Sequence, residues 1–212
     1  MTSGFGANKP PISVRWDRQI RSAPNQLTLL RLALIPFIIV SVLNTQWNWA
    51  LGLFLLAGIS DGLDGFLART LHQRTMVGAY LDPIADKLLL STLFLELAFV
   101  RKIPWSVTVM VLSRDVIILV VCAALYMAAN FREFRPSMLG KMNTFAQIGT
   151  LFVVLLAQVW SPSIVQGAVW LGIRATVVLT VISGLHYTIR LGWQLRAGDR
   201  DRRAGVGSLP SS

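Results

Sequence analysis

Four aspartates in an otherwise apolar chain are the residues best suited to chemistry. Asp61 and Asp64 are three positions apart, and Asp82 and Asp86 are four positions apart. On an α-helix, either spacing places both carboxylates on the same face. Two helical segments joined by the polar stretch 70–75 would each present such a pair. If the pairs face each other, they form an all-oxygen site that suits Mg²⁺ or Mn²⁺, whereas zinc prefers nitrogen and sulfur ligands.

The sequence on both sides of the aspartates is strongly apolar, over residues 49–59 and 88–100. Carboxylates at membrane depth are costly unless they are paired, solvated or metal-bound, and they therefore mark functional sites. One alternative is a buried ion-pair network with Arg69 and Lys87. We favour a metal site, because four carboxylates against two cations leave excess negative charge that a metal ion would neutralise.

The composition predicts a single integral membrane domain. Of 212 residues, 54% are hydrophobic and only 14% are charged, whereas a soluble domain has about a quarter charged residues. We attribute the net charge of +10 to cytoplasmic loops and anionic lipid head groups, and expect no nucleic-acid partner because no motif for one is present. The single cysteine, Cys122, excludes a disulfide within the chain.

The apolar runs predict an all-α bundle of about six transmembrane helices, since each run is about 20 residues long. The expected spans are 27–43, 49–69, 76–100, 105–129, 141–160 and 165–193. Residues 24–193 would form the membrane catalytic domain, between a cytoplasmic arm at 1–23 and a disordered basic tail at 194–212. Part of the arm, 12–22, fits an interfacial amphipathic helix and a solvated segment equally well.

Arginine-rich connections set the expected orientation. The arm, the link 70–75, the loop 131–140 and the tail alternate with less basic loops along the chain. The positive-inside rule then places both termini in the cytoplasm. We expect a multi-pass protein of the bacterial inner (cytoplasmic) membrane, with the aspartate site on its cytoplasmic side.

The aspartate stretch resembles the signature of the CDP-alcohol phosphatidyltransferase family at every position of its motif. The matching residues are Asp61, Asp64, Gly65, Ala68, Arg69, Gly78, Asp82 and Asp86. Eight fixed residues at fixed spacing make this resemblance specific, although the motif covers only about one eighth of the chain. The opening of the first span, Asn25-x-Leu27-Thr28-x2-Arg31, is a softer match to the same family.

The resemblance implies a reaction and a set of roles. An alcohol would attack the β-phosphate of a CDP-alcohol and release CMP. The four aspartates would hold two Mg²⁺ or Mn²⁺ ions, and Asp86 would also be the general base. The residues implied at the donor site are Gly65, Ala68, Arg69, Thr75 and Gly78, with Thr28 and Arg31 from the first span. The resemblance also suggests a homodimer.

Taken without the resemblance, Arg31 has a simpler interpretation. It lies one turn inside the first span, where a long cationic side chain could reach the lipid head groups.

We expect CDP-diacylglycerol as the donor and glycerol 3-phosphate as the acceptor, as in phosphatidylglycerophosphate synthases. The alternative acceptor is phosphatidylglycerol, as in eukaryotic-type cardiolipin synthases. Both branches resemble the run 140–147, whereas Ser113–Val116 and the pattern Lys-x-Asn-Thr at Lys141–Thr144 also resemble the cardiolipin synthases. Our preference for glycerol 3-phosphate rests on how widespread that branch is.

The candidate acceptor-binding residues are Arg114, Asp115, Arg132, Arg135 and Lys141. Arg114 and Asp115 fit a helix-stabilising pair as well, and the other three fit topology determinants as well.

A cation transporter is a distant alternative, with the metal as cargo. Such a fold usually shows paired repeats with broken helices. We recognise no internal repeat in this sequence.

Overall fold

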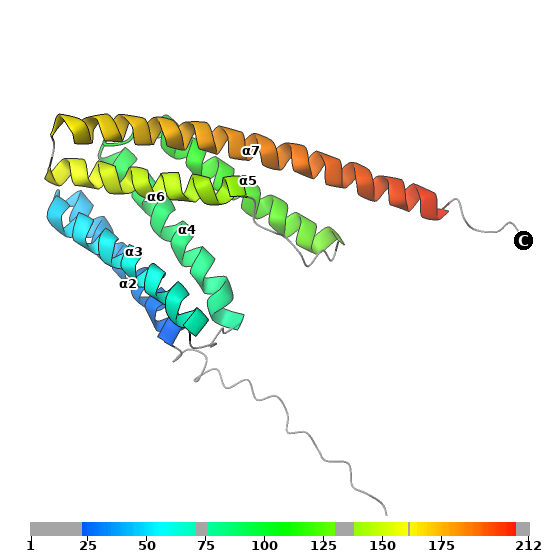
Figure 1. The fold of residues 1–212 in the computed structure, drawn as a ribbon, viewed down its shortest axis with the longest axis horizontal. Coiled ribbons are helices and arrows are strands. Elements are labelled where there is room, and N and C mark those ends of the chain that lie inside the picture. Colours follow the sequence, from blue (N-terminus) through cyan, green and yellow to red (C-terminus); the bar gives the residue numbers. More distant parts are fainter. Residues whose placement is uncertain (1–22, 71–75, 130–137, 161, 207–212) are drawn as a thin grey trace, which may run out of the picture.

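The computed structural model describes the backbone of residues 23–70, 76–129, 138–160 and 162–206 (Figure 1). Side chains are described within 28–63, 84–120, 138–160 and 162–185. The arm with its proposed interfacial helix, the link 71–75 and most of the loop 131–140 lie outside these ranges.

Six helices make up the described part of the chain, which contains no strand. They are α2 (Ala23–Leu43), α3 (Trp47–Thr70), α4 (Met76–Phe99), α5 (Trp105–Ala129), α6 (Met138–Val159) and α7 (Ser163–Val206). The all-helical prediction is therefore confirmed, and the start of each helix lies within a few residues of the expected one. Two stretches, Met138–Val159 and Ser163–Leu185, are long and apolar enough to cross a membrane by length and composition.

The C-terminal helix is longer than the sequence predicted. Residues 194–206 were expected to be disordered, but α7 continues through them to Val206. The expectation was wrong for this segment, because a charged and hydrophilic composition does not by itself prevent helix formation. Gln, Leu, Arg and Ala are all good helix formers. In Figure 1, α7 extends well beyond the other helices.

The hydrophobic core lies between α2, α3, α4, α5 and α6, where helix faces of large aliphatic side chains meet. α2 packs against both α3 and α4, and α6 packs against α7 and α3. The fully buried core residues include Ile38, Val42, Ala57, Leu93, Phe94, Leu97, Val111 and Leu155. α2 is therefore a packing partner of both motif helices, and α6 also contacts both of them.

Small polar residues line the contact between α6 and α7. Thr150 and Thr176 are joined through their hydroxyl oxygens at 2.8 Å, and the Thr180 hydroxyl donates to Asn143 Oδ1 at 3.1 Å. A Cβ added to Gly172 would lie 3.1 Å from Thr150 Oγ1. These small side chains let the two helices approach closely, as is common between helices in membranes.

A charged cluster links α4, α5 and α7. Lys87 Nζ lies 2.8 Å from Asp115 Oδ2, and Arg114 Nη1 lies 2.7 Å from Asp115 Oδ1. Arg114 Nη2 also donates to Ser183 Oγ at 2.7 Å. Arg114 and Asp115 are each only 7% exposed, so the cluster satisfies charged groups that would be costly to bury alone.

This geometry predicts that Asp115→Ala will strongly destabilise the protein. The change leaves Lys87 and Arg114 close together without their shared carboxylate, which should cost about 3–5 kcal/mol. Ser183→Ala is the matched control, because it removes only one hydrogen bond to Arg114 and should cost about 1.5–3 kcal/mol. Thermal unfolding of both variants in the same detergent tests the difference. Equal losses would mean that Asp115 does not hold the cluster together.

Candidate active site

The motif aspartates lie on the two helices that pack against α2. Asp61 and Asp64 belong to α3, and Asp82 and Asp86 belong to α4. Both pairs lie within continuous helix, so the prediction that each pair sits on a helix is confirmed. Side chains are described for Asp61 and Asp86, whereas those of Asp64 and Asp82 lie outside the described set.

Arg31 of α2 joins the two motif helices. Its Nη2 donates to Asp61 Oδ1 at 2.6 Å, and its Nη1 donates to Asp86 Oδ1. The Arg31 side chain is 1% exposed, whereas those of Asp61 and Asp86 are 50% and 43% exposed. The guanidinium is therefore buried beneath two carboxylates that remain about half exposed at the surface of the helix bundle.

This contact corrects the interpretation of Arg31 as a residue that reaches toward head groups. Its side chain turns inward because two carboxylates at hydrogen-bond distance are better partners than a solvated surface.

One observation indicates that the described carboxylates could bind a divalent cation. Asp61 and Asp86 come from different helices and already share a single positive group. Their oxygens are the hard ligands that Mg²⁺ and similar ions require. Within the described side chains there is no group of three or more Asp, Glu, His or Cys residues that could hold an ion. The complete four-carboxylate site accordingly remains a prediction.

The ion-pair alternative takes a different form from the one expected. Lys87 pairs with Asp115 rather than serving the motif aspartates in the described contacts, and the side chain of Arg69 is outside the described set. The cation that contacts Asp61 and Asp86 is Arg31.

The other predicted site residues are placed only in part. Thr28 is buried on α2, three positions before Arg31, and Lys141 is exposed in the first turn of α6. Gly65, Ala68, Arg69 and Gly78 lie on the motif helices, but their surroundings are not described. Thr75, Arg132 and Arg135 lie outside the described residues altogether.

The side chains of Arg114 and Asp115 are buried and hydrogen-bonded to each other, which favours their interpretation as a helix-stabilising pair. Ser183, which accepts a hydrogen bond from Arg114, was not predicted from the sequence. A signal was nevertheless present. Thr176, Thr180 and Ser183 recur at helical spacing in an apolar run and place small hydroxyls on one helix face.

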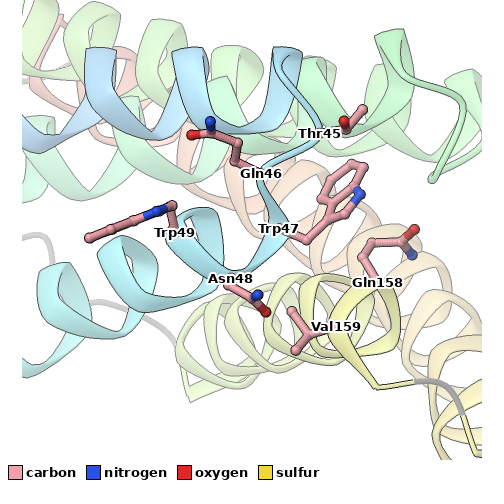
Figure 2. A pocket seen from close by; sticks show the side chains of 7 residues that line it. All are labelled: Thr45, Gln46, Trp47, Asn48, Trp49, Gln158 and Val159. Carbon is pink, nitrogen blue, oxygen red and sulfur yellow. The ribbon is translucent and has the colours of Figure 1, made fainter.

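A separate pocket lies at the turn between α2 and α3 (Figure 2). It has a volume of about 370 Å³ and is lined by Thr45, Gln46, Trp47, Asn48, Trp49, Gln158 and Val159. Lys102 Nζ lies 5.4 Å from the centre of the Trp47 ring. Trp47 and Asp61 are fourteen residues apart on α3, which corresponds to about 21 Å along a helix. The pocket is therefore distinct from the carboxylate site.

Comparison with known proteins covers most of the chain. The family pattern described as CDP-alcohol phosphatidyltransferase matches residues 21–182. The human protein named "Cardiolipin synthase (CMP-forming)" is 33% identical over 77% of this chain and 60% of its own length. The chain thus spans about three fifths of that relative.

Two bacterial relatives are covered more fully. The "Probable phosphatidylglycerophosphate synthase" of Mycobacterium tuberculosis (strain ATCC 25618 / H37Rv) is 36% identical over 81% of this chain and 82% of its own. The "CDP-diacylglycerol--glycerol-3-phosphate 3-phosphatidyltransferase" of Bacillus subtilis (strain 168) is 32% identical over 77% of this chain and 92% of its own. Because the family pattern includes the aspartate stretch, Arg31, all of five helices (α2 to α6) and the first part of α7, this chain belongs to the CDP-alcohol phosphatidyltransferase family.

Proposed function

We propose that this protein transfers a phosphatidyl group from CDP-diacylglycerol to glycerol 3-phosphate and releases CMP. The observation that carries the proposal is that two aspartates of the family motif, Asp61 and Asp86, come from different helices and contact the same cation, Arg31. Family membership supports the reaction class, and the names of the two bacterial relatives support this acceptor.

Each aspartate has a proposed role. Asp61, Asp64, Asp82 and Asp86 would hold two divalent ions, Mg²⁺ or Mn²⁺. When bound, such ions neutralise charge on a diphosphate and stabilise the leaving phosphate. Asp86 would accept the proton of the acceptor hydroxyl as general base. The acceptor oxygen then forms a bond to the β-phosphorus, and the bond to the CMP oxygen breaks.

The partial exposure of Asp86 supports its role as the base. At 43% exposure its carboxylate can be reached from outside the bundle. At the same time, the contact with Arg31 holds its side chain in a defined direction. A base needs both access to the hydroxyl and a fixed orientation.

We also propose that all six helices span the bilayer, with both termini in the cytoplasm of a bacterium. Large apolar side chains are exposed on every helix from α2 to α7, among them Phe37, Ile59, Leu95, Leu119, Phe145 and Ile164. Exposed apolar surface of this extent is uncommon on soluble monomers. The homodimer is proposed from family resemblance.

A cardiolipin synthase-like activity is the second candidate, with phosphatidylglycerol as acceptor. It is favoured by the human and rat relatives, both named "Cardiolipin synthase (CMP-forming)" and 33% and 32% identical to this chain.

Substitution of the aspartates tests the site. Asp86→Asn should lower turnover by at least about 100-fold, because general bases typically contribute 10²–10⁴-fold, while much of the donor binding remains. Asp61→Ala should lose metal binding and turnover together. CMP release and binding of Mn²⁺ measure these outcomes.

Glu96→Gln is the matched control, since Glu96 is a buried carboxyl on the same helix, ten residues beyond Asp86. It should retain turnover. Rates like those of the wild type in Asp86→Asn or Asp61→Ala would refute the site assignment.

The acceptor is tested with purified protein, CDP-diacylglycerol and Mg²⁺ or Mn²⁺. Glycerol 3-phosphate and phosphatidylglycerol are offered in separate reactions, and CMP and the lipid product are followed. We expect CMP and phosphatidylglycerophosphate with glycerol 3-phosphate alone. CMP with phosphatidylglycerol alone would establish the second candidate instead. CMP with neither would exclude both acceptors and direct the search to other alcohols.

A further inference from the structure

Arg31 is a buried cation that contacts two of the motif aspartates. Its side chain is 1% exposed, and a guanidinium buried to this extent is costly unless carboxylates compensate it. Asp61 and Asp86 provide that compensation from α3 and α4. The same contact relieves the repulsion between the two carboxylates, which would otherwise oppose the packing of both helices on α2.

The guanidinium uses oxygens that a metal ion would need. It contacts Asp61 Oδ1 and Asp86 Oδ1, which belong to residues proposed as metal ligands. Two positive groups cannot share these oxygens closely without strong repulsion. Arg31 lies on the buried side and the carboxylates are half exposed, so an ion can approach them from the side opposite to the guanidinium.

We propose that Arg31 is a positioning residue that holds Asp61 and Asp86 together before metal binds and then competes with the metal for their oxygens. Arg31 thereby stabilises the metal-free bundle and lowers the affinity of the site for divalent cations. This inference rests on the proposed metal site. It concerns a state without metal or substrate, and it can be measured apart from catalysis.

Arg114 provides a matched comparison within the same chain. It is also a buried arginine on a helix, but it contacts Asp115 and Ser183, which lie outside the aspartate motif. Loss of Arg114 should therefore destabilise the protein equally with and without metal. Loss of Arg31 should destabilise mainly the metal-free protein.

The experiment compares Arg31→Gln with Arg114→Gln and the wild type in one detergent. Thermal unfolding is recorded in EDTA and across a Mn²⁺ titration, and bound Mn²⁺ is counted from the loss of the free-ion EPR signal. Without metal, Arg31→Gln should lower Tm by about 5–10 °C. Saturating Mn²⁺ should remove most of this deficit, and Mn²⁺ should bind about tenfold more tightly than to the wild type. Arg114→Gln should show a Tm deficit that Mn²⁺ does not change, with wild-type Mn²⁺ affinity.

Several results would overturn the proposal. A Tm deficit of Arg31→Gln that is the same with and without Mn²⁺ would make Arg31 an ordinary structural cation. Unchanged or weaker Mn²⁺ binding would exclude competition. If Arg31→Gln does not fold in EDTA, purification in Mn²⁺ should rescue it, and failure of that rescue would also count against the proposal.

The outcome can be separated from that of the proposed function. Wild-type protein that binds Mn²⁺ and releases CMP while Arg31→Gln behaves like Arg114→Gln would reject only the inference about Arg31. Wild-type protein that binds no Mn²⁺ would reject the metal site and the competition together.

Discussion

The arrangement depends on how charge is neutralised between α2, α3 and α4. Arg31 lies under Asp61 and Asp86, and α2 is the helix against which both motif helices pack. Apolar packing by Ile38, Leu93 and similar residues brings these helices together. Such packing does not select which charged side chains lie next to one another. The ion pairs add this selectivity, because a helix arrangement that moves Asp61 and Asp86 away from Arg31 would leave a buried cation uncompensated.

α4 connects this site to the rest of the bundle through two consecutive residues. Asp86 contacts Arg31 of α2, whereas Lys87 contacts Asp115 of α5. Neighbouring residues on a helix point about 100° apart, so one helix can serve two charged clusters on different sides. Arg114 and Ser183 extend the second cluster to α7. α4 thereby makes charged contacts with α2 through Asp86 and with α5 through Lys87.

The sequence predicted the helices and the motif more readily than the contacts between them. Helix positions follow from apolar runs, and the pairs Asp61–Asp64 and Asp82–Asp86 follow from helical spacing. The two partners of Arg31 could not be predicted from helical spacing, because Asp61 and Asp86 lie 30 and 55 positions away from it. Its contact with both of them depends on how α2 packs against α3 and α4. The continuation of α7 to Val206 was missed for another reason, since hydrophilic composition does not by itself exclude a helix.

The described contacts also bear on where the acceptor is recognised. Arg114 and Asp115 are each only 7% exposed and lie in a buried cluster in which Asp115 accepts hydrogen bonds from two cations, so neither is readily reached by a substrate. Among the proposed acceptor residues with described side chains, only Lys141 is exposed. It lies in the first turn of α6. Glycerol 3-phosphate carries a terminal phosphate that a cation there could bind, and phosphatidylglycerol carries an anionic phosphodiester beside its diol. An exposed Lys141 therefore fits either of the two candidate acceptors.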